Sequence, residues 1–439
     1  MSTLPDEPRW VERSARWSLP TRIVFRFCVL YFGLYVVLTQ MLTTLFFVPG
    51  VDLPDVAMLP PLSTAVTWVA KHVFGVTTEL VIRGSGSGDK IYDWVLVFCL
   101  LVLAIAGTIV WSVLDRRRPS YVLLHGWFRV FLRFAVGSTL LSYGVIKVVP
   151  LQMPYPSLIR LVEPYGDLSP MGVLWAPLGA SPAYQAFTGC AETLAGILLL
   201  LPRTTLLGAL IALADAIQVF ALNMTYDVPV KLFSFHLILM AVFLIAPDGR
   251  RLVDFFMLDR TAGPSTQPPP FRSKRANRAA LIVQAVFTLY LLGANFYSAR
   301  QNWFEYGGGA PRSPLYGIWD GEEMASDGAS RPPLLSDAER WRRVIFPSLQ
   351  AVAFQRMDDS FDRFWAAIDS ASRKIDLTKG EDKKWKATIT YERPAPERLV
   401  LEGEMDGHRY RMQLRLTDHT KRLLVSRGFH WVQEYPFNR

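Results

Sequence analysis

The sequence predicts an all-α polytopic membrane protein with seven transmembrane helices, followed by a small β-rich α+β domain outside the cytoplasm. Of its 439 residues, 51% are hydrophobic and only 19% are charged. The apolar residues come in blocks, several of which reach the roughly 20 residues needed to cross about 30 Å of hydrocarbon. After about residue 335 the blocks give way to alternating apolar and polar residues. These observations exclude a soluble enzyme of two or three domains.

Seven apolar runs are candidate spans, and the first is too long for a cleaved signal peptide. The third is the weakest, because Arg129 and Arg133 lie in its first turns, from which they can snorkel to the interface. The runs are residues 22–48, 91–114, 127–149, 183–202, 204–223, 229–246 and 279–298.

Lys and Arg flank the spans unequally, which predicts their orientation. With a cytoplasmic N-terminus, the inner side collects Arg9, Arg13, Arg16, Arg22, Arg116, Arg117, Arg118, Arg203, Arg250, Arg251, Arg260, Arg272, Lys274, Arg275 and Arg278. The outer loops then hold Lys71, Arg83, Lys90 and Arg160. We therefore expect a multi-pass protein of a bacterial inner membrane with a periplasmic or extracellular C-terminal domain. The formal charge of +9 largely reflects this bias, so nucleic acid is a poor candidate partner.

The predicted organisation has five parts. Two N-terminal spans and a long outer loop are followed by a four-helix core, a linker with the seventh span, a connector and the outer domain. These parts cover residues 1–126, 127–258, 259–300, 301–334 and 335–439.

Local patterns predict further elements outside the spans. In the first outer loop, residues 63–81 have an apolar face at helical spacing and predict a helix on the membrane surface. Residues 150–182, rich in Pro, Gly and aromatics, suit a structured cap. In the outer domain, a capping-box pattern over Ser336–Glu339 predicts a short helix through Trp341. Asp406-Gly407 between alternating runs predicts a hairpin, and residues 427–439 are expected to form a core strand and an edge.

Polar residues inside the spans are the best candidates for a functional site, because ionisable groups in hydrocarbon are costly unless paired or hydrated. Counting 1.5 Å per residue places four of them roughly 9 to 14 Å below the outer boundary, in one layer, and two lysines about 3 Å below it. The four are Tyr143, Glu192, Asp215 and His236, the lysines are Lys147 and Lys231, and Gln218 lies one turn from Asp215.

One interpretation of this layer is a pocket for a quinone head group. Glu192 and Asp215 would exchange protons, His236 would hydrogen-bond a carbonyl or hydroxyl, and Lys147 would neutralise a carboxylate. Tyr143, Gln218 and Lys231 are candidate quinone-binding residues. The alternative interpretation is that Glu192 pairs with Lys147 and Asp215 with His236, merely fixing helix packing.

The segment Tyr226–Lys231 lies where the chain re-enters the membrane at the start of the sixth span. Asp227 is a candidate helix cap, whereas a lysine in the first turn opposes the helix dipole, so we expect Lys231 to reach a lipid phosphate or a carboxylate. The three cysteines form no thiol pair, and no haem, flavin or iron–sulfur motif is present. His408, His419 and His430 are equally spaced, but this is no recognised metal pattern.

Short motifs in spans three to six resemble the DoxX family of four-helix membrane proteins. They are Arg133-x-x-x-Gly137, Gly144-x-x-Lys147, Gly189-x-x-Glu192-x-x-x-Gly196 and the Thr204-Thr205 turn, and the resemblance covers roughly residues 127–258. It implies a DoxX-like four-helix core related to the DoxD-type subunit of thiosulfate:quinone oxidoreductase. It also implies that Lys147 and Glu192 are a functional pair, with Gly144, Gly189 and Gly196 allowing close helix approach.

Together these patterns predict a quinone-linked oxidoreductase component that receives electrons from a periplasmic donor. A different class remains open: a non-catalytic carrier or assembly protein whose C-terminal domain binds an envelope partner. Transport of a lipid or another small molecule is a weaker third possibility.

Overall fold

A computed structural model describes residues 16–264, 271–380 and 385–438, which divide into two compact units. The membrane unit comprises Met1–Val149 and Ala186–Arg300, and the barrel unit comprises Pro150–Gln185 and Gln301–Arg439. Arg9 and Arg13, which contribute to the predicted charge bias, and part of the predicted linker, residues 265–270, lie outside the described residues.

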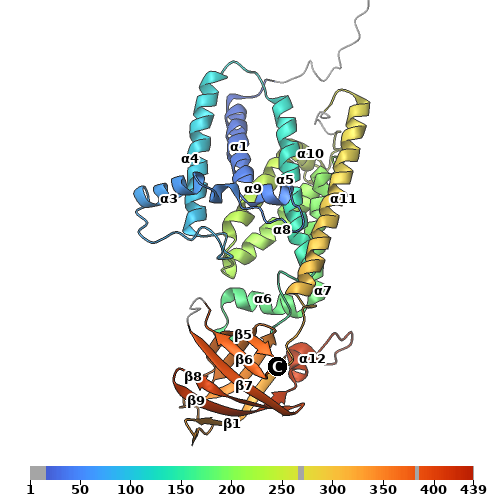
Figure 1. Ribbon diagram of the computed structural model, residues 1–439. Coiled ribbons are helices and arrows are strands. Elements are labelled where there is room, and N and C mark those ends of the chain that lie inside the picture. The colour runs from blue at the N-terminus through green and yellow to red at the C-terminus, as the bar shows by residue number, and fades with distance from the viewer. Residues whose placement is uncertain (1–15, 265–270, 381–384, 439) are drawn as a thin grey trace, which may run out of the picture. The chain divides into compact units, whose positions relative to one another are not determined.

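The membrane unit contains the seven predicted spans, each a helix long and apolar enough to cross a bilayer. Figure 1 shows these helices running alongside one another. They are α1 (Leu19–Leu38), α4 (Ile91–Leu114), α5 (Val122–Val148), α7 (Pro182–Leu200), α8 (Thr205–Thr225), α9 (Lys231–Ile245) with α10 (Gly249–Phe256), and α11 (Lys274–Glu305).

Three expectations about the helices of the membrane unit need correction. The first run divides at Thr39 into α1 and the short α2 (Gln40–Leu45). The surface helix of the outer loop, α3, is shorter than expected and covers Leu62–His72. Helix α5 begins at Val122, so Arg129 and Arg133 lie inside it and are only 9% and 7% exposed. They do not snorkel, because helix-end carbonyls and other polar groups inside the bundle accept their hydrogen bonds.

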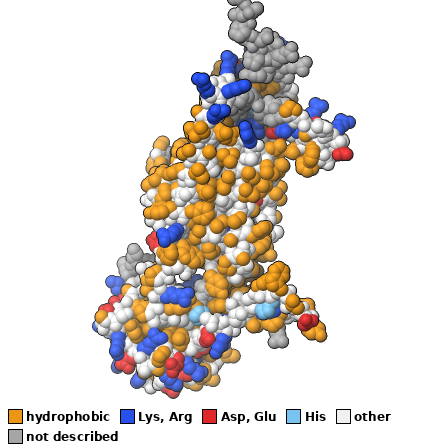
Figure 2. Space-filling view, turned by 90° about the vertical axis from the view of Figure 1, so that its right-hand side faces the viewer, with side chains coloured by type: hydrophobic (Ala, Val, Ile, Leu, Met, Phe, Trp, Pro, Cys, Tyr) orange, Lys and Arg blue, Asp and Glu red, His pale blue; other side chains and the backbone are white. Residues whose placement is uncertain are grey.

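Apolar side chains cover the outside of the membrane unit. On the face drawn in Figure 2, hydrophobic groups dominate the bundle and Lys and Arg gather at one of its ends. Ile109 and Val113 of α4 and Leu289 of α11 are 60%, 67% and 68% exposed. Such a surface is stable in lipid and costly in water. The lipid bilayer is therefore the environment that this unit fits.

The barrel unit is an antiparallel meander that closes on itself (Figure 1). Strand β1 pairs with β3, each strand from β3 onward pairs with the next in sequence, and β9 also pairs with β1 from Ile318–Thr417 to Ser326–Tyr410, which closes eight strands into a barrel. The ninth strand, β2 (Ala329–Ser330), pairs with β1 alone. The other strands are β1 (Gly317–Ser326), β3 (Trp341–Ser348), β4 (Ala351–Arg356), β5 (Phe361–Asp369), β6 (Lys374–Thr378), β7 (Lys386–Ala395), β8 (Arg398–Met405) and β9 (His408–Thr417).

The alternating apolar residues of the outer domain face the interior of the barrel. Ala387, Ile389 and Tyr391 of β7 point into the barrel core, as do Met412 and Leu414 of β9. Asp406 and Gly407 form the predicted hairpin turn, with φ of 52° and 82°, a region that glycine and aspartate tolerate.

Three other expectations for this unit are wrong or incomplete. The first strand, β1, already lies within the predicted connector. No helix forms at Ser336, because Glu339 pairs with Arg331 instead of closing a capping box, and β3 starts at Trp341. Residues 427–438 form no strand. The α content of the described unit is limited to α6 (Pro170–Ala180), the four-residue α12 (Leu423–Ser426) and short 3₁₀ turns.

The segment Pro150–Gln185 belongs to the barrel unit rather than to the spans on either side of it. Leu158 is 2% exposed and packs in one cluster with Ile318 and Ile345 of the barrel. The side-chain amide of Gln355 also donates to the carbonyl of Val162, at 3.4 Å. These contacts are consistent with the expected structured cap.

Candidate functional site

Glycines bring α5 and α7 into backbone contact. A Cβ atom on Gly144 would lie 2.4 Å from Thr193 Oγ1 and 2.6 Å from Thr193 N. A Cβ on Gly189 would lie 2.6 Å from the Gly144 carbonyl oxygen, and one on Gly196 would lie 2.7 Å from that of Gly137. Real Cβ atoms do not approach so closely, so the contact requires glycine on both helices.

This close approach places Lys147 against Glu192 inside the bundle. Lys147 Nζ donates to Glu192 Oε1, and the two side chains are 9% and 4% exposed. The second carboxylate oxygen, Glu192 Oε2, is buried without a hydrogen-bond partner. Asp215 of α8 is within electrostatic range of both Glu192 and Lys147. One ammonium and two carboxyl groups therefore lie together at α5, α7 and α8, with Lys147 and Glu192 buried and Asp215 half-buried.

His236 of α9 belongs to a second cluster, formed with α1. Its Nδ1 lies 2.6 Å from the Leu232 carbonyl oxygen and its Nε2 lies 2.8 Å from the Tyr31 hydroxyl. Because a carbonyl only accepts, Nδ1 carries the proton and Nε2 accepts from Tyr31. The imidazole also stacks on Tyr35, with 3.9 Å between ring centroids. The alternative pairing of Asp215 with His236 is therefore wrong, since both ring nitrogens have other partners.

Tyr143 lies between the two clusters. Its hydroxyl donates to Gln40 Oε1 of α2 at 3.3 Å, and its side chain is within electrostatic range of both Glu192 and Tyr35. Glu192, Asp215, Tyr143 and His236 thus come from four helices of one unit, in two clusters with Tyr143 between them. Gln218 does not join them, since it lies on the exposed side of α8.

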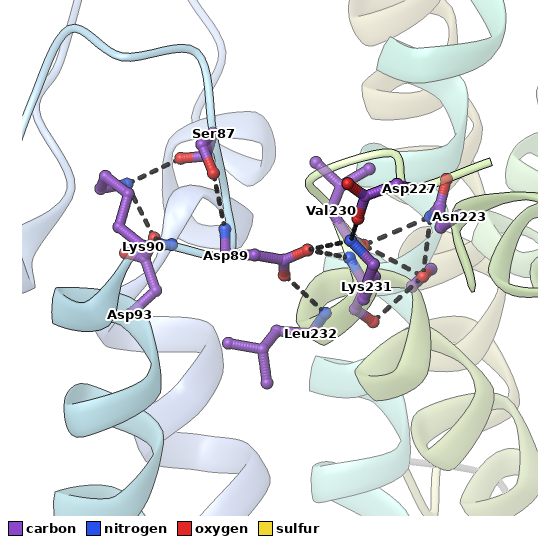
Figure 3. Close-up of polar contacts among 10 residues, drawn as sticks. Ser87, Asp89, Lys90, Asp93, Asn223, Asp227, Val230, Lys231 and Leu232 are labelled. Atoms are coloured by element: carbon purple, nitrogen blue, oxygen red, sulfur yellow. Dashed lines mark hydrogen bonds and ion pairs between the residues drawn. The ribbon is translucent and has the colours of Figure 1, made fainter. Parts of the chain in front are cut away.

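Lys231 pairs with carboxylates. Its Nζ lies 2.8 Å from Asp227 Oδ1 and 3.8 Å from Asp89 Oδ2 (Figure 3). The sequence predicted that Lys231 reaches either a lipid phosphate or a carboxylate, and in the structure it reaches carboxylates. Asp227 does not cap α9, because its φ of 51° places it in the preceding turn.

The cap of α9 comes from a distant segment. Asp89 accepts hydrogen bonds from the backbone N–H groups of Lys231 and Leu232, at 2.8 and 2.9 Å (Figure 3). Gly88 N also donates to the Pro229 carbonyl at 2.8 Å. The Gly/Ser stretch before α4 is thus attached to α9 at its end. A carboxylate at a helix N-terminus is favourable because it satisfies free N–H groups and opposes the helix dipole.

Asp55, in the loop before α3, is a further ionisable group close to Tyr143. Burial raises the pKa of its carboxyl group to about 6, and the negative charge of Asp93 adds to the rise, while Lys90 and Arg83 oppose it. Asp55 is also within electrostatic range of Tyr143. Asp55 is therefore a carboxyl group near Tyr143 whose pKa lies above its ordinary value.

Sequence reasoning missed several residues of this layer. Tyr31 and Tyr35 are spaced four apart in the first span, which places both on one helix face, but aromatic residues at this spacing occur in most apolar helices. Gln40 lies inside the predicted first span, and Asp89 lies at the end of the predicted first outer loop, just before the second span. Their roles depend on contacts with α5 and α9 that no local pattern encodes.

The C-terminal histidines do not meet. His408 pairs with Asp327 at 2.7 Å, and His430 contacts Arg427. In residues 16–264, 271–380 and 385–438, no three His, Cys, Asp or Glu side chains are grouped so that they could hold a metal ion.

No protein-family model matches the chain, and no solved structure matches it. Over 138 residues the chain is 30% identical to the uncharacterised protein YwoB of Bacillus subtilis strain 168. The match covers 29% of this chain and 79% of that protein.

Proposed function

The chain belongs to the same family as the uncharacterised protein YwoB, and from its own polar groups we propose that it is a quinone-linked oxidoreductase component of a bacterial inner membrane. The observation that carries the proposal is the cluster of Lys147, Glu192 and Asp215, with one Glu192 oxygen left without a partner.

Charge balance explains why this cluster suits proton exchange. If Lys147, Glu192 and Asp215 were all ionised, one negative charge would remain uncompensated in an apolar surrounding, which is costly. The balanced state has one proton shared by the two carboxyl groups. Removal of that proton requires a new counter-charge or a change in a bound molecule. A quinone that takes up or releases protons with its electrons provides such a change.

The neighbouring groups are suitable for holding a quinone head group. Tyr143 is a hydroxyl donor between the carboxyl cluster and the His236 cluster, and Tyr31 and Tyr35, which stack on His236, give this region an aromatic lining. In this proposal Glu192 and Asp215 exchange the protons, while Tyr143 and His236 orient the ring. Lys147 keeps the carboxyl pair partly ionised.

The proposed orientation follows from the Lys and Arg bias, with the N-terminus in the cytoplasm and the barrel unit in the periplasm. The motifs around Lys147 and Glu192 also support a DoxX-like four-helix core made of α5, α7, α8 and α9. Since the sequence contains no haem, flavin or iron–sulfur motif, a periplasmic donor supplies the electrons in this scheme.

The test is binding of a short-chain quinone, ubiquinone-1 or menadione, to the purified full chain in lipid nanodiscs. We expect saturable binding by the wild type and a loss of at least about tenfold in affinity for Glu192→Gln, because the amide cannot accept the proton. Glu79→Gln is the matched control, since Glu79 is an exposed carboxyl in the outer loop. Absence of quinone binding by the wild type, or equal binding by Glu192→Gln, would contradict the proposal.

A second candidate function is a non-catalytic assembly or carrier protein that binds an envelope partner. The exposed aromatic residues after α12 favour it, since Trp431 and Tyr435 are 90% and 84% exposed. Exposed aromatics of this kind are common anchors at protein interfaces. Crosslinking in whole cells would test it: a partner captured by the wild type and lost in a Trp431→Ala, Tyr435→Ala double variant supports this function. Capture that is unchanged in the variant contradicts it.

A further inference from the structure

Two arginines lie on one face of α5, at the opposite end of the bundle from Lys147. Arg129 and Arg133 are four residues apart, which places them one turn apart on the same side of the helix. They follow the first residue of α5 by about 10 and 17 Å along the axis. Both are enclosed, with 9% and 7% exposure. Buried arginines at membrane depth are rare and require compensation.

The compensation that the protein supplies is incomplete. Arg133 donates to the carbonyl of Leu200 at 3.1 Å and to Gln284 Oε1 at 2.5 Å, and among the described residues no carboxylate pairs with it. Arg129 donates to the carbonyl of Leu244 at 3.0 Å. The Nε atom of each arginine is buried without an acceptor.

Asp248 is the carboxylate that pairs with arginines at this end of the bundle. Asp248 Oδ2 lies 3.6 Å from Arg129, and its other oxygen lies 2.5 Å from Arg251. The carbonyls of Leu200 and Leu244 are at the C-terminal ends of α7 and α9, where each helix contributes only about half a negative charge. Three guanidinium groups thus share one carboxylate and two helix ends.

Arg26, in α1, is a useful contrast. Its Nε donates to the Tyr121 hydroxyl at 2.9 Å, one terminal nitrogen to Ser112 Oγ at 2.8 Å, and the other to the Asp115 carbonyl at 2.9 Å. All three nitrogens of this buried arginine have a partner. The bundle can therefore satisfy an arginine completely, and it does not do so at Arg129 and Arg133.

We propose that Arg129 and Arg133 form a binding site for a phosphate group, with α5 at its centre and α9 and α11 at its sides. Guanidinium groups bind phosphate oxygens through paired hydrogen bonds, and two of them one turn apart present donors to a single phosphate. The phosphate is either the head group of an anionic lipid or a soluble phosphate anion. Clusters of Lys and Arg at this end of the bundle raise the local concentration of either one.

The test compares the thermal unfolding of the full chain in three environments. They are nanodiscs of phosphatidylcholine, the same with a minority of phosphatidylglycerol, and phosphatidylcholine nanodiscs with added inorganic phosphate. We expect at least one of the anions to raise the unfolding temperature of the wild type by about 3 °C or more. A shift with phosphatidylglycerol alone identifies a lipid head group, and a shift with inorganic phosphate identifies a soluble ligand.

Arg129→Gln and Arg133→Gln should abolish the shift. Arg250→Gln is the matched control because Arg250 is at the same end of the bundle but 95% exposed, and it should keep the shift. If Arg133→Gln does not fold, Arg133→Lys decides, since it keeps the charge but loses the planar donor pair and should reduce the shift. The proposal is overturned if neither anion stabilises the wild type, if Arg250→Gln loses the shift equally, or if the α5 variants retain it.

Discussion

The membrane unit and the barrel unit expose opposite kinds of side chain. The barrel encloses apolar residues such as Trp319 and Phe346, both 0% exposed, and its ion pairs lie mainly on the outside. The membrane unit exposes apolar residues and encloses ion pairs such as Lys147–Glu192. The reason is the surrounding medium, since water solvates the barrel's charges whereas lipid cannot solvate those of the bundle. A buried charge in the bundle is therefore a better indication of a functional site than an exposed charge on the barrel.

The largest effect should come from removing the centre of the barrel. Trp319→Ala deletes a fully buried ring whose Nε1 donates to the Leu315 carbonyl at 2.8 Å, and should cost about 3 to 5 kcal/mol. Protease cleavage within residues 317–417 of the full chain, followed with rising temperature, measures it. Trp365→Ala is the control, because Trp365 is 57% exposed on β5. Equal sensitivity of the two variants would contradict an apolar barrel core.

In the membrane unit the corresponding change is loss of one member of an ion pair. Lys147→Met leaves Glu192 without its cation and should destabilise the bundle by about 3 to 5 kcal/mol. Thermal unfolding in detergent measures it. The exposed barrel pair Arg409–Glu402, with 76% and 42% exposed side chains, should lose at most about 1 kcal/mol in Arg409→Met. Similar losses for both pairs would remove the contrast between the units.

A smaller effect is expected at the glycine contact. Gly144→Ala forces α5 and α7 apart, because the added Cβ meets the backbone nitrogen of Thr193 at 2.6 Å, and should cost about 1 to 3 kcal/mol. Gly126→Ala, on the same helix, meets nothing within 4 Å and should be neutral or slightly stabilising. Thermal unfolding of both variants tests this, and a neutral Gly144→Ala would show that the two helices are not in backbone contact.

The smallest effect concerns pH. Since burial raises the pKa of Asp55 to about 6, its contribution to stability is fully present below the ordinary value near 3.8 and is lost as pH rises through 6. Asp55→Asn should abolish this loss, as measured by unfolding temperatures between those pH values. The exposed Asp327 of the barrel has the opposite sign, because a hydrogen bond from His408 lowers its pKa, so its contribution is lost as pH falls. Asp55→Asn with an unchanged pH profile would contradict the burial of this carboxyl.

Local patterns were sufficient for much of the fold. Apolar length predicted the seven spans, and period-two alternation predicted the inward faces of β7 and β9. The pairing of Lys147 with Glu192 was also predictable, since two opposite charges at membrane depth have few other ways to be compensated. Each of these depends on the medium or on spacing within one element.

Other features could not be predicted from local patterns. His236 pairs with Tyr31, at a sequence separation of 205, and Asp89 caps a helix 142 residues away. The start of α5, which decides whether Arg129 and Arg133 are at the interface or inside, depends on how α7, α9 and α11 pack around it.

The sequence by itself determined which helices are long and apolar enough to cross a membrane and that a β domain follows them, because length and periodicity express the preference of side chains for their medium. Only the tertiary structure decided which polar groups meet, that β9 closes on β1, and which of the buried charges lack a partner. Those outcomes depend on distances between residues far apart in the chain, and a carboxylate or a guanidinium has no local signal for the partner it will find.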